Sequence, residues 1–175
     1  MLEKNIADLL VEKKAIQFGN FLLASGRISN YYVDIKTAAT DPILLRLIGS
    51  FISMRYKFDV VAGIAVGGVP LAVATSMISK KPYAIIRKAE KDHGQSNLII
   101  GDVKDKKILL VEDVTTSGGS ALYGINVIRA AGGTIDNVIT VVDREQGAEK
   151  LLFDHAVQLH SIVKIDNLIN KHGKK

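Results

Sequence analysis

Two acidic residues followed by a loop of hydroxyl residues and glycines are the part of this sequence best suited to chemistry. Glu112 and Asp113 come directly after four apolar residues, and the loop occupies residues 115–120. Backbone N–H groups in a glycine-rich turn that opens a helix can surround a phosphate, and the helix dipole favours the anion. The carboxylates would repel a polyphosphate but accept hydrogen bonds from sugar hydroxyls. The pattern therefore favours a phosphorylated ribose as ligand.

Other phosphate-binding motifs do not fit this stretch. It lacks the Gly-x-x-x-x-Gly-Lys-Ser/Thr spacing of a nucleoside-triphosphate loop, and Gly118-Gly119 does not match Gly-x-Gly-x-x-Gly. A structural alternative is that Asp113 or one of the threonines merely caps the helix that follows. Both interpretations stay open on these residues alone.

The surrounding pattern predicts that this stretch lies in a parallel sheet. Residues 108–111 form an apolar run that indicates a strand buried on both faces, and Glu112 and Asp113 end that run. Apolar residues then recur at helical spacing over 121–128. Further strands are predicted at 60–64, 83–86, 138–142 and near 156–160, with helices from residues 42 and 69 and at 149–153 and 163–170. This alternation predicts an α/β fold with a doubly wound, mainly parallel sheet flanked by helices.

The N-terminal part of the chain predicts a smaller unit beside the sheet. We expect an amphipathic helix over residues 2–13, a strand pair or hairpin edge over 15–23, and a turn and strand over 25–34. Asp41-Pro42 is a strong helix start, with Asp41 as N-cap. We therefore expect a single domain over residues 1–175, with an N-terminal hood at about 1–40 and a core at about 41–175.

Composition limits the classes of protein that fit. The chain has 175 residues, 47% of them hydrophobic, no cysteine and a net charge of +5, which suggests an anionic ligand or a nucleic-acid surface. The histidines show no metal-ligand spacing, and no signal peptide is evident, so we expect a cytoplasmic protein. Residues 60–79 carry no charge, but glycines and Pro70 in their middle favour a strand, turn and helix over a membrane span.

Three further features place candidate ligand contacts around the sheet. The loop Val66-Gly67-Gly68 follows a predicted strand, and its glycines let backbone N–H groups approach an anion. Four side chains that can carry positive charge fall within seven residues, namely Arg87, Lys88, Lys91 and His93. Such a run is usually a solvated loop. Arg144 follows another strand, and its guanidinium suits a carboxylate. The alternative for Arg144 is an ion pair with Glu145 or Glu149.

Several of these segments resemble one family. Residues 110–120, Leu-Val-Glu-Asp-Val-Thr-Thr-Ser-Gly-Gly-Ser, resemble the phosphoribosyl-pyrophosphate (PRPP) signature of type I phosphoribosyltransferases. Arg-Lys-x-x-Lys-x-His-Gly at 87–94 is similar to the catalytic loop of orotate phosphoribosyltransferases, and residues 25–34 resemble their N-terminal segment. Asp-Arg-x-x-Gly at 143–147 resembles their arginine motif for the base. The motifs occur in family order over essentially the whole chain.

The resemblance implies transfer of the phosphoribosyl group of PRPP to N1 of orotate, which gives orotidine 5′-monophosphate and pyrophosphate in pyrimidine (UMP) biosynthesis. The implied catalytic residues are Lys88, Lys91, His93 and Asp113. The implied PRPP-binding residues are Arg87, Lys88, Lys91, His93, Glu112, Asp113, Val114, Thr115, Thr116, Ser117, Gly118, Gly119 and Ser120, with Val66, Gly67 and Gly68 as the pyrophosphate loop. The implied orotate contacts are Ser25, Gly26, Arg27, Thr116 and Arg144.

The same resemblance implies the partners of the reaction. Mg²⁺ would be held mainly by PRPP and water, without a dedicated set of protein ligands. A homodimer with shared active sites is implied, in which Lys88 reaches the neighbouring site, and no nucleic acid or membrane is expected. The chain departs from many relatives at Ala24 and Gly67, where they carry lysines. Lys36 is a candidate substitute for the lysine missing at Ala24, and at Gly67 the pyrophosphate contacts would come mainly from the backbone. The alternatives are a phosphoribosyltransferase for another base and a non-catalytic PRPP- or nucleotide-sensing regulator.

Overall fold

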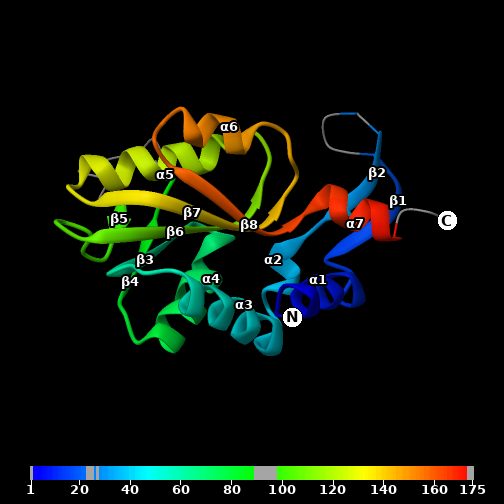
Figure 1. Cartoon of the computed structure of the whole chain (residues 1–175), viewed down its shortest axis with the longest axis horizontal. Coiled ribbons are helices and arrows are strands. Elements are labelled where there is room, and N and C mark those ends of the chain that lie inside the picture. The colour runs from blue at the N-terminus through cyan, green and yellow to red at the C-terminus, as the bar shows by residue number, and fades with distance from the viewer. Residues whose placement is uncertain (1, 23–25, 27, 89–97, 173–175) are drawn as a thin grey trace.

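A six-stranded sheet forms the centre of the part of the chain that the computed structural model describes, namely residues 2–22, 26, 28–88 and 98–172 (Figure 1). The strand order is β5 (Ile99–Ile100), β4 (Tyr83–Ile86), β3 (Val60–Ile64), β6 (Lys107–Thr115), β7 (Thr134–Asp143) and β8 (Gln158–Lys164). All neighbouring pairs are parallel except β4 and β5, which are antiparallel. The mainly parallel sheet that we predicted is confirmed.

Helices cover both faces of this sheet. The helices α3 (Pro42–Arg55) and α4 (Gly68–Ser79) lie on one face, and α5 (Gly119–Ala130) and α6 (Ala148–Phe153) lie on the other (Figure 1). Successive side chains of a strand point to opposite faces. Accordingly Leu109 and Val111 pack in the core beneath α3, whereas Ile108 and Leu110 pack in the core beneath α5. The central strand β6 is therefore buried on both sides, as its apolar run predicted.

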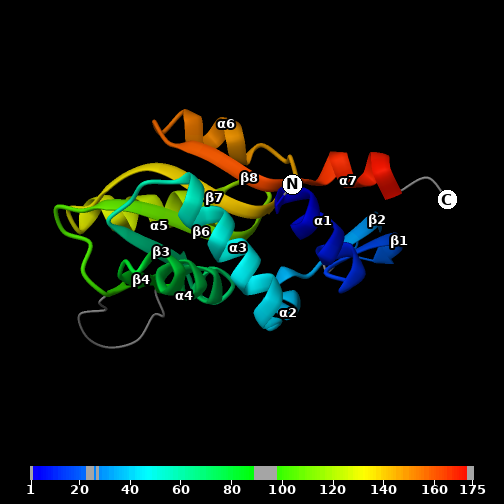
Figure 2. The same ribbon diagram turned by 60° about the horizontal axis from the view of Figure 1, so that its bottom comes forward.

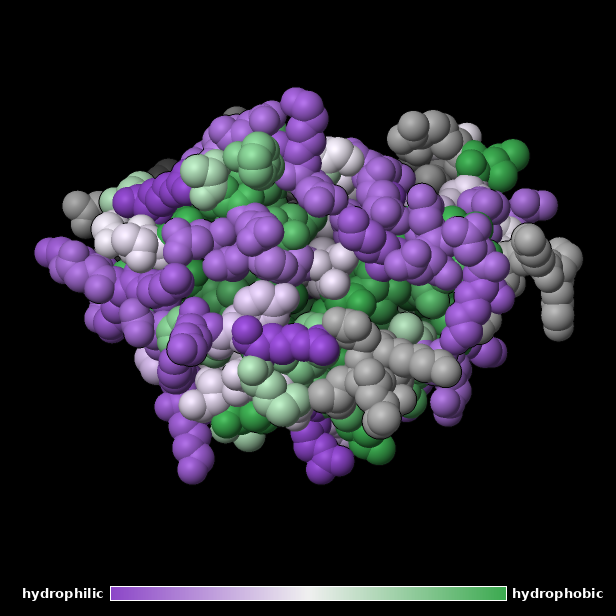
Figure 3. All heavy atoms as spheres, in the orientation of Figure 1, coloured by the Kyte–Doolittle hydropathy of each residue, from purple (hydrophilic) through white to green (hydrophobic). Residues whose placement is uncertain are grey.

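The N-terminal residues form the expected smaller unit at one end of the sheet. It contains α1 (Leu2–Glu12), the antiparallel pair β1 (Ile16–Leu22) and β2 (Ile28–Val33), and the short helix α2 (Ile35–Ala38), with α7 (Ile165–His172) beside it (Figure 2). Leu10, Ile16 and Ile35 are buried in the same hydrophobic core as α3. The hood is thus packed on the sheet through shared apolar residues. On the outside, hydrophilic side chains cover most of the molecular surface that Figure 3 shows.

Local signals place the helix starts correctly. Asp41 is the N-cap of α3, and its Oδ1 accepts hydrogen bonds from the backbone N–H groups of Ile43 (3.0 Å) and Leu44 (2.9 Å). Residues 60–79 form β3 and α4, as predicted. None of the helices in the described part of the chain has the length and apolar character needed to cross a membrane.

Several predicted boundaries were wrong. The strand predicted at 138–142 is β7 at 134–143, and the helix predicted at 163–170 is α7 at 165–172. The strand β6 does not stop before the acidic pair, because its parallel pairing with β7 continues from Glu112 opposite Thr140 to Thr115 opposite Asp143. The last strand lies at 158–164 rather than near 156–160, since its pairing with β7 extends from Gln158 to Lys164. For β6 and β8, ladder hydrogen bonds to a neighbouring strand override the local composition.

Candidate functional site

The two predicted anion loops meet above the carboxyl ends of β3 and β6. A Cβ atom on Gly63 would lie 2.3 Å from the carbonyl oxygen of Gly68, and one on Gly68 would lie 2.5 Å from that of Val111. A Cβ atom on Gly67 would lie 2.3 Å from the Asp113 carboxyl carbon. The glycines therefore allow the loop at 65–67 to pack directly against the acidic pair. No side chain fits at position 67 without displacing Asp113.

The acidic pair occupies both sides of β6. Because side chains alternate along a strand, Glu112 lies on the α5 side with Leu110, and Asp113 lies on the opposite side with Val111. Both residues are buried, with 5% and 6% exposure. Burial raises the pKa of Glu112 from its usual 4.5 to about 8, and the Asp113 charge adds to this rise, while Lys88 and Lys36 oppose it. Glu112 is therefore mainly uncharged at neutral pH.

A lysine from the hood faces the other member of the pair. The Lys36 ammonium lies 3.0 Å from Asp113 Oδ2. Lys36 belongs to α2, and Asp34 caps that helix by accepting hydrogen bonds from the Thr37 backbone N–H (3.1 Å) and hydroxyl (2.7 Å). The Asp113 hydrogen bond and charge raise the pKa of Lys36. Asp113 thus has a positive partner from the hood.

The hydroxyl and glycine loop opens α5 without a side-chain cap. Gly118 is the N-cap residue, in the left-handed region with a φ of 85°, and no side chain caps this end. The alternative that Asp113 or a threonine caps the helix is therefore wrong. The first intrahelical hydrogen bond runs from Leu122 N–H to the Gly118 carbonyl oxygen, at 2.9 Å. The N–H groups before it have no intrahelical acceptor, so they are available to an anion.

Arg144 lies beside this loop and contacts the hood. Its backbone N–H donates to the Thr115 carbonyl oxygen at 2.9 Å, and its Nε donates to the Tyr31 hydroxyl at 3.3 Å. The guanidinium carbon lies 5.1 Å from the centre of the Tyr31 ring. Among the ion pairs of the described residues, none joins Arg144 to Glu145 or Glu149. Glu149 pairs with Lys164 instead, so the ion-pair alternative for Arg144 is wrong.

Comparison with known proteins agrees with this arrangement. The family model described as "Phosphoribosyl transferase domain" matches residues 39–170. The orotate phosphoribosyltransferase of Methanocorpusculum labreanum is 55% identical over 164 residues, which cover 94% of this chain and 97% of that protein. The chain belongs to the orotate phosphoribosyltransferase family.

Solved structures of orotate phosphoribosyltransferases share the fold. The enzyme from Aeropyrum pernix superposes with a TM-score of 0.84 at 29% identity, covering 97% of this chain and 99% of that one. The Mycobacterium tuberculosis orotate phosphoribosyltransferase in complex with PRPP gives a TM-score of 0.79 at 28% identity, covering 96% and 99%. The family resemblance therefore extends over the hood as well as the sheet.

Some predicted contacts of an orotate phosphoribosyltransferase lie outside the described residues: Ser25, Arg27, Lys91 and His93. Arg87 and Lys88 are described and exposed, at the end of β4. The Tyr123 hydroxyl of α5 donates to the Arg87 carbonyl oxygen at 2.9 Å, which ties the start of the predicted catalytic loop to the helix that follows the PRPP motif. Gly26 is exposed at the tip of the hood hairpin.

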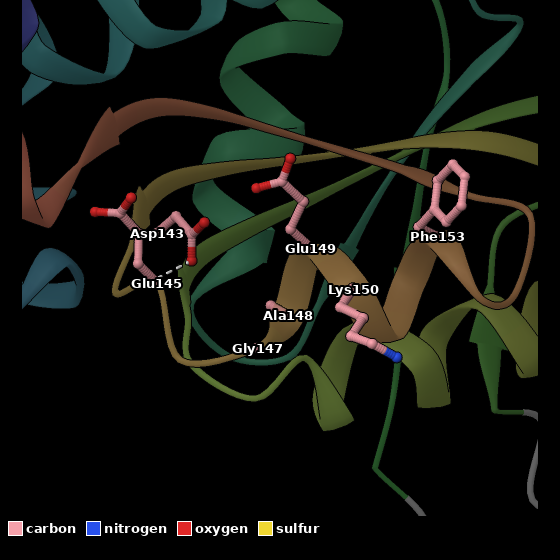
Figure 4. A pocket seen from close by; sticks show the side chains of 7 residues that line it. All are labelled: Asp143, Glu145, Gly147, Ala148, Glu149, Lys150 and Phe153. Atoms are coloured by element: carbon pink, nitrogen blue, oxygen red, sulfur yellow. Dashed lines mark hydrogen bonds between the residues drawn. The ribbon is translucent and has the colours of Figure 1, made fainter.

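A cavity of about 410 Å³ lies beside these motifs but has the wrong charge for the substrates (Figure 4). It is lined by Asp143, Glu145, Gly147, Ala148, Glu149, Lys150 and Phe153. Three carboxylates would repel PRPP and orotate. Asp143 has a structural role there, because its Oδ1 accepts hydrogen bonds from the Thr115 hydroxyl (3.2 Å) and the Glu145 N–H (3.0 Å). It thereby holds the turn that carries Arg144.

Sequence reasoning missed Tyr31 and Asp143 as residues that organise the site. Tyr31 is part of the segment at 25–34 that resembles the N-terminal segment of the family, but no local signal pairs it with Arg144. Asp143 was predicted only as the first residue of the Asp-Arg-x-x-Gly motif, with no role of its own. Within the described ranges, no group of three or more His, Cys, Asp or Glu side chains is arranged to hold a metal ion.

Proposed function

We propose that this protein transfers the 5-phosphoribosyl group of PRPP to N1 of orotate, releasing orotidine 5′-monophosphate and pyrophosphate, in the de novo synthesis of UMP. The main support is the meeting of the acidic pair, the uncapped start of α5 and Arg144 at the carboxyl edge of the sheet. Ligands of doubly wound folds bind at this edge. The 55% identity to an orotate phosphoribosyltransferase over 94% of the chain agrees with it.

In this proposal the loop at 116–120 binds the 5-phosphate, because the free N–H groups at the start of α5 point at an anion there. Glu112 and Asp113 bind the ribose hydroxyls. Both residues lie near the positive charge that develops on the ribose in an oxocarbenium-like transition state. Val66, Gly67 and Gly68 bind the diphosphate through backbone groups.

Arg144 binds the orotate carboxylate in the same proposal. Its hydrogen bond to Tyr31 uses Nε, and the described residues make no hydrogen bond to its two terminal nitrogens. Those nitrogens can donate in parallel to the two oxygens of a carboxylate. Thr116 and the tip of the hood, with Ser25, Gly26 and Arg27, complete the proposed orotate site.

The proposed lid consists of Arg87, Lys88, Lys91 and His93. These side chains would close over the diphosphate, stabilise its developing negative charge as it leaves, and exclude water. We propose a homodimer in which Lys88 reaches the site of the neighbouring subunit. Mg²⁺ bound to the PRPP diphosphate would neutralise part of its charge. PRPP and water would supply most of the Mg²⁺ ligands. The two nearby carboxyl groups agree with this, because Asp113 is paired with Lys36 and Glu112 is mainly protonated.

An assay with four bases tests the proposal directly. The purified protein is incubated with PRPP and MgCl₂ and with orotate, uracil, adenine or hypoxanthine, and nucleotide and pyrophosphate are measured. We expect product with orotate only, because Arg144 has a carboxylate to bind only in that base. Comparable product from another base would contradict the assignment of orotate. The absence of product with every base would contradict a catalytic role.

A further inference from the structure

The most unusual contact in the site joins the hood to the acidic pair. Lys36 is 65% exposed along its side chain, yet its ammonium lies 3.0 Å from a carboxylate whose side chain is only 9% exposed. Oδ2 of Asp113 has no hydrogen-bond donor among the described residues apart from this ammonium. An unpaired buried carboxylate is costly, so Lys36 is an important stabilising partner of Asp113.

The position of Lys36 is set by its neighbours in α2. Ile35 and Ala38 are buried and anchor the helix in the core, while the Asp34 cap fixes its first turn. Lys36 therefore projects from a held backbone toward the end of β6. A side chain at position 67 cannot take its place, because a Cβ atom on Gly67 would collide with the Asp113 carboxyl.

The charge balance shows what this contact can do. PRPP carries several negative charges, and a buried carboxylate beside its binding loops would repel them. Glu112 is mainly protonated at neutral pH, and the negative charge that Lys36 contacts is that of Asp113. Lys36 neutralises that charge, and the other charged groups that act on the cluster are Asp34 and Lys88.

We propose that Lys36 is the positioning residue of the PRPP site: it holds Asp113 Oδ2 and neutralises Asp113, so that the polyanionic substrate binds beside a fixed and charge-balanced carboxylate. This inference rests on the proposed function. Lys36 acts through Asp113 and is not assigned a contact with the reacting atoms. In the proposed function the hood faces the base. With Lys36 in this role, a residue of the hood is also necessary for binding PRPP.

A double-mutant cycle tests the proposal, with the Kd for PRPP measured by calorimetry in MgCl₂. Lys36→Met should raise Kd at least about tenfold, because Asp113 loses its charged partner. Lys36→Arg should restore Kd to within about threefold of the wild type, because it keeps the charge. In an Asp113→Asn background, Lys36→Met should change Kd by less than about twofold, because the two effects share one interaction.

Lys107→Met is the matched control. Lys107 lies at the other end of β6 and pairs with Asp136 at the same distance of 3.0 Å, so its loss removes one lysine and one ion pair remote from the site. Lys107→Met should leave the Kd for PRPP within about twofold of the wild-type value. An unchanged Kd in Lys36→Met, or an equal weakening in the Asp113→Asn background, would overturn the positioning role. Wild-type protein that binds no PRPP would instead refute the proposed function.

Discussion

Tyr31 and Arg144 lie 113 positions apart in the sequence and meet through a hydrogen bond of 3.3 Å from Arg144 Nε to the tyrosine hydroxyl. The tyrosine ring also lies beneath the guanidinium, 5.1 Å from its carbon. A hydrogen bond to Nε fixes the plane of the guanidinium, and the direction of the terminal nitrogens follows from that plane. The hood therefore orients the arginine that we assign to the orotate carboxylate.

Tyr31→Phe should raise the KM for orotate by roughly three- to tenfold and leave the KM for PRPP within twofold. The substitution removes the hydroxyl that accepts from Nε but keeps the ring, so it removes about 0.5–1.5 kcal/mol of orientation while the cation–π contact remains. Steady-state kinetics with each substrate varied in turn measures both constants. Tyr83→Phe on β4, remote from the site, is the control and should change neither. Equal effects on the two substrates would contradict the orienting role.

Arg144→Ala should have a larger effect on the same substrate. Loss of two charge-assisted hydrogen bonds to a carboxylate is expected to weaken orotate binding by roughly 10- to 100-fold, and PRPP binding should change little. Equilibrium binding of each ligand separates the two effects. If both ligands were weakened equally, Arg144 would not be the carboxylate contact.

Gly67→Ala tests the contact between the proposed pyrophosphate loop and the acidic pair. The new Cβ atom would lie 2.3 Å from the Asp113 carboxyl carbon, so either the loop or the carboxylate must move. We expect a loss of about 1–3 kcal/mol in the free energy of unfolding, measured by urea denaturation, and weaker PRPP binding. Gly119→Ala is the steric control for stability, because a Cβ atom there meets no atom within 4 Å. Wild-type stability in Gly67→Ala would show that this contact is not tight.

Glu112 predicts a specific dependence of stability on pH. Because its pKa rises from 4.5 to about 8 on folding, the folded protein keeps a proton in this range that the unfolded chain has lost. The stabilising contribution is complete below about pH 4.5 and is lost as the pH rises through 8. As the pH rises from about 4.5 to 8, the free energy of unfolding of the wild type should therefore fall relative to that of Glu112→Gln. The fall should be at most about 1.4 kcal/mol per pH unit.

Urea denaturation of both proteins at intervals from pH 5 to pH 9 measures this difference. Asp113, Lys88 and Lys36 are the charged groups that act on Glu112, so the same series in Lys36→Met should move the fall to higher pH. A constant difference between wild type and Glu112→Gln over the whole range would mean that Glu112 is ionised in the folded protein.

The sequence by itself determined the features that depend on neighbouring residues. The apolar run at 108–111 predicted a strand buried on both faces, Asp41-Pro42 predicted the start of α3, and the hydroxyl and glycine residues at 115–120 predicted the turn that opens α5. These are properties of backbone conformation and periodicity over a few residues, so contiguous residues carry them. The order of the motifs also placed the chain in its family.

The tertiary structure decided which distant side chains meet. The sequence predicted that Glu112 and Asp113 end a strand, but pairing with β7 carries β6 past them and places the two carboxylates on opposite faces. Lys36 reaches Asp113 only because α2 is anchored in the core beside β6, and Tyr31 reaches Arg144 only because the hood packs at the end of the sheet. Such contacts depend on strand order, register and the packing of separate elements, which local sequence patterns do not encode.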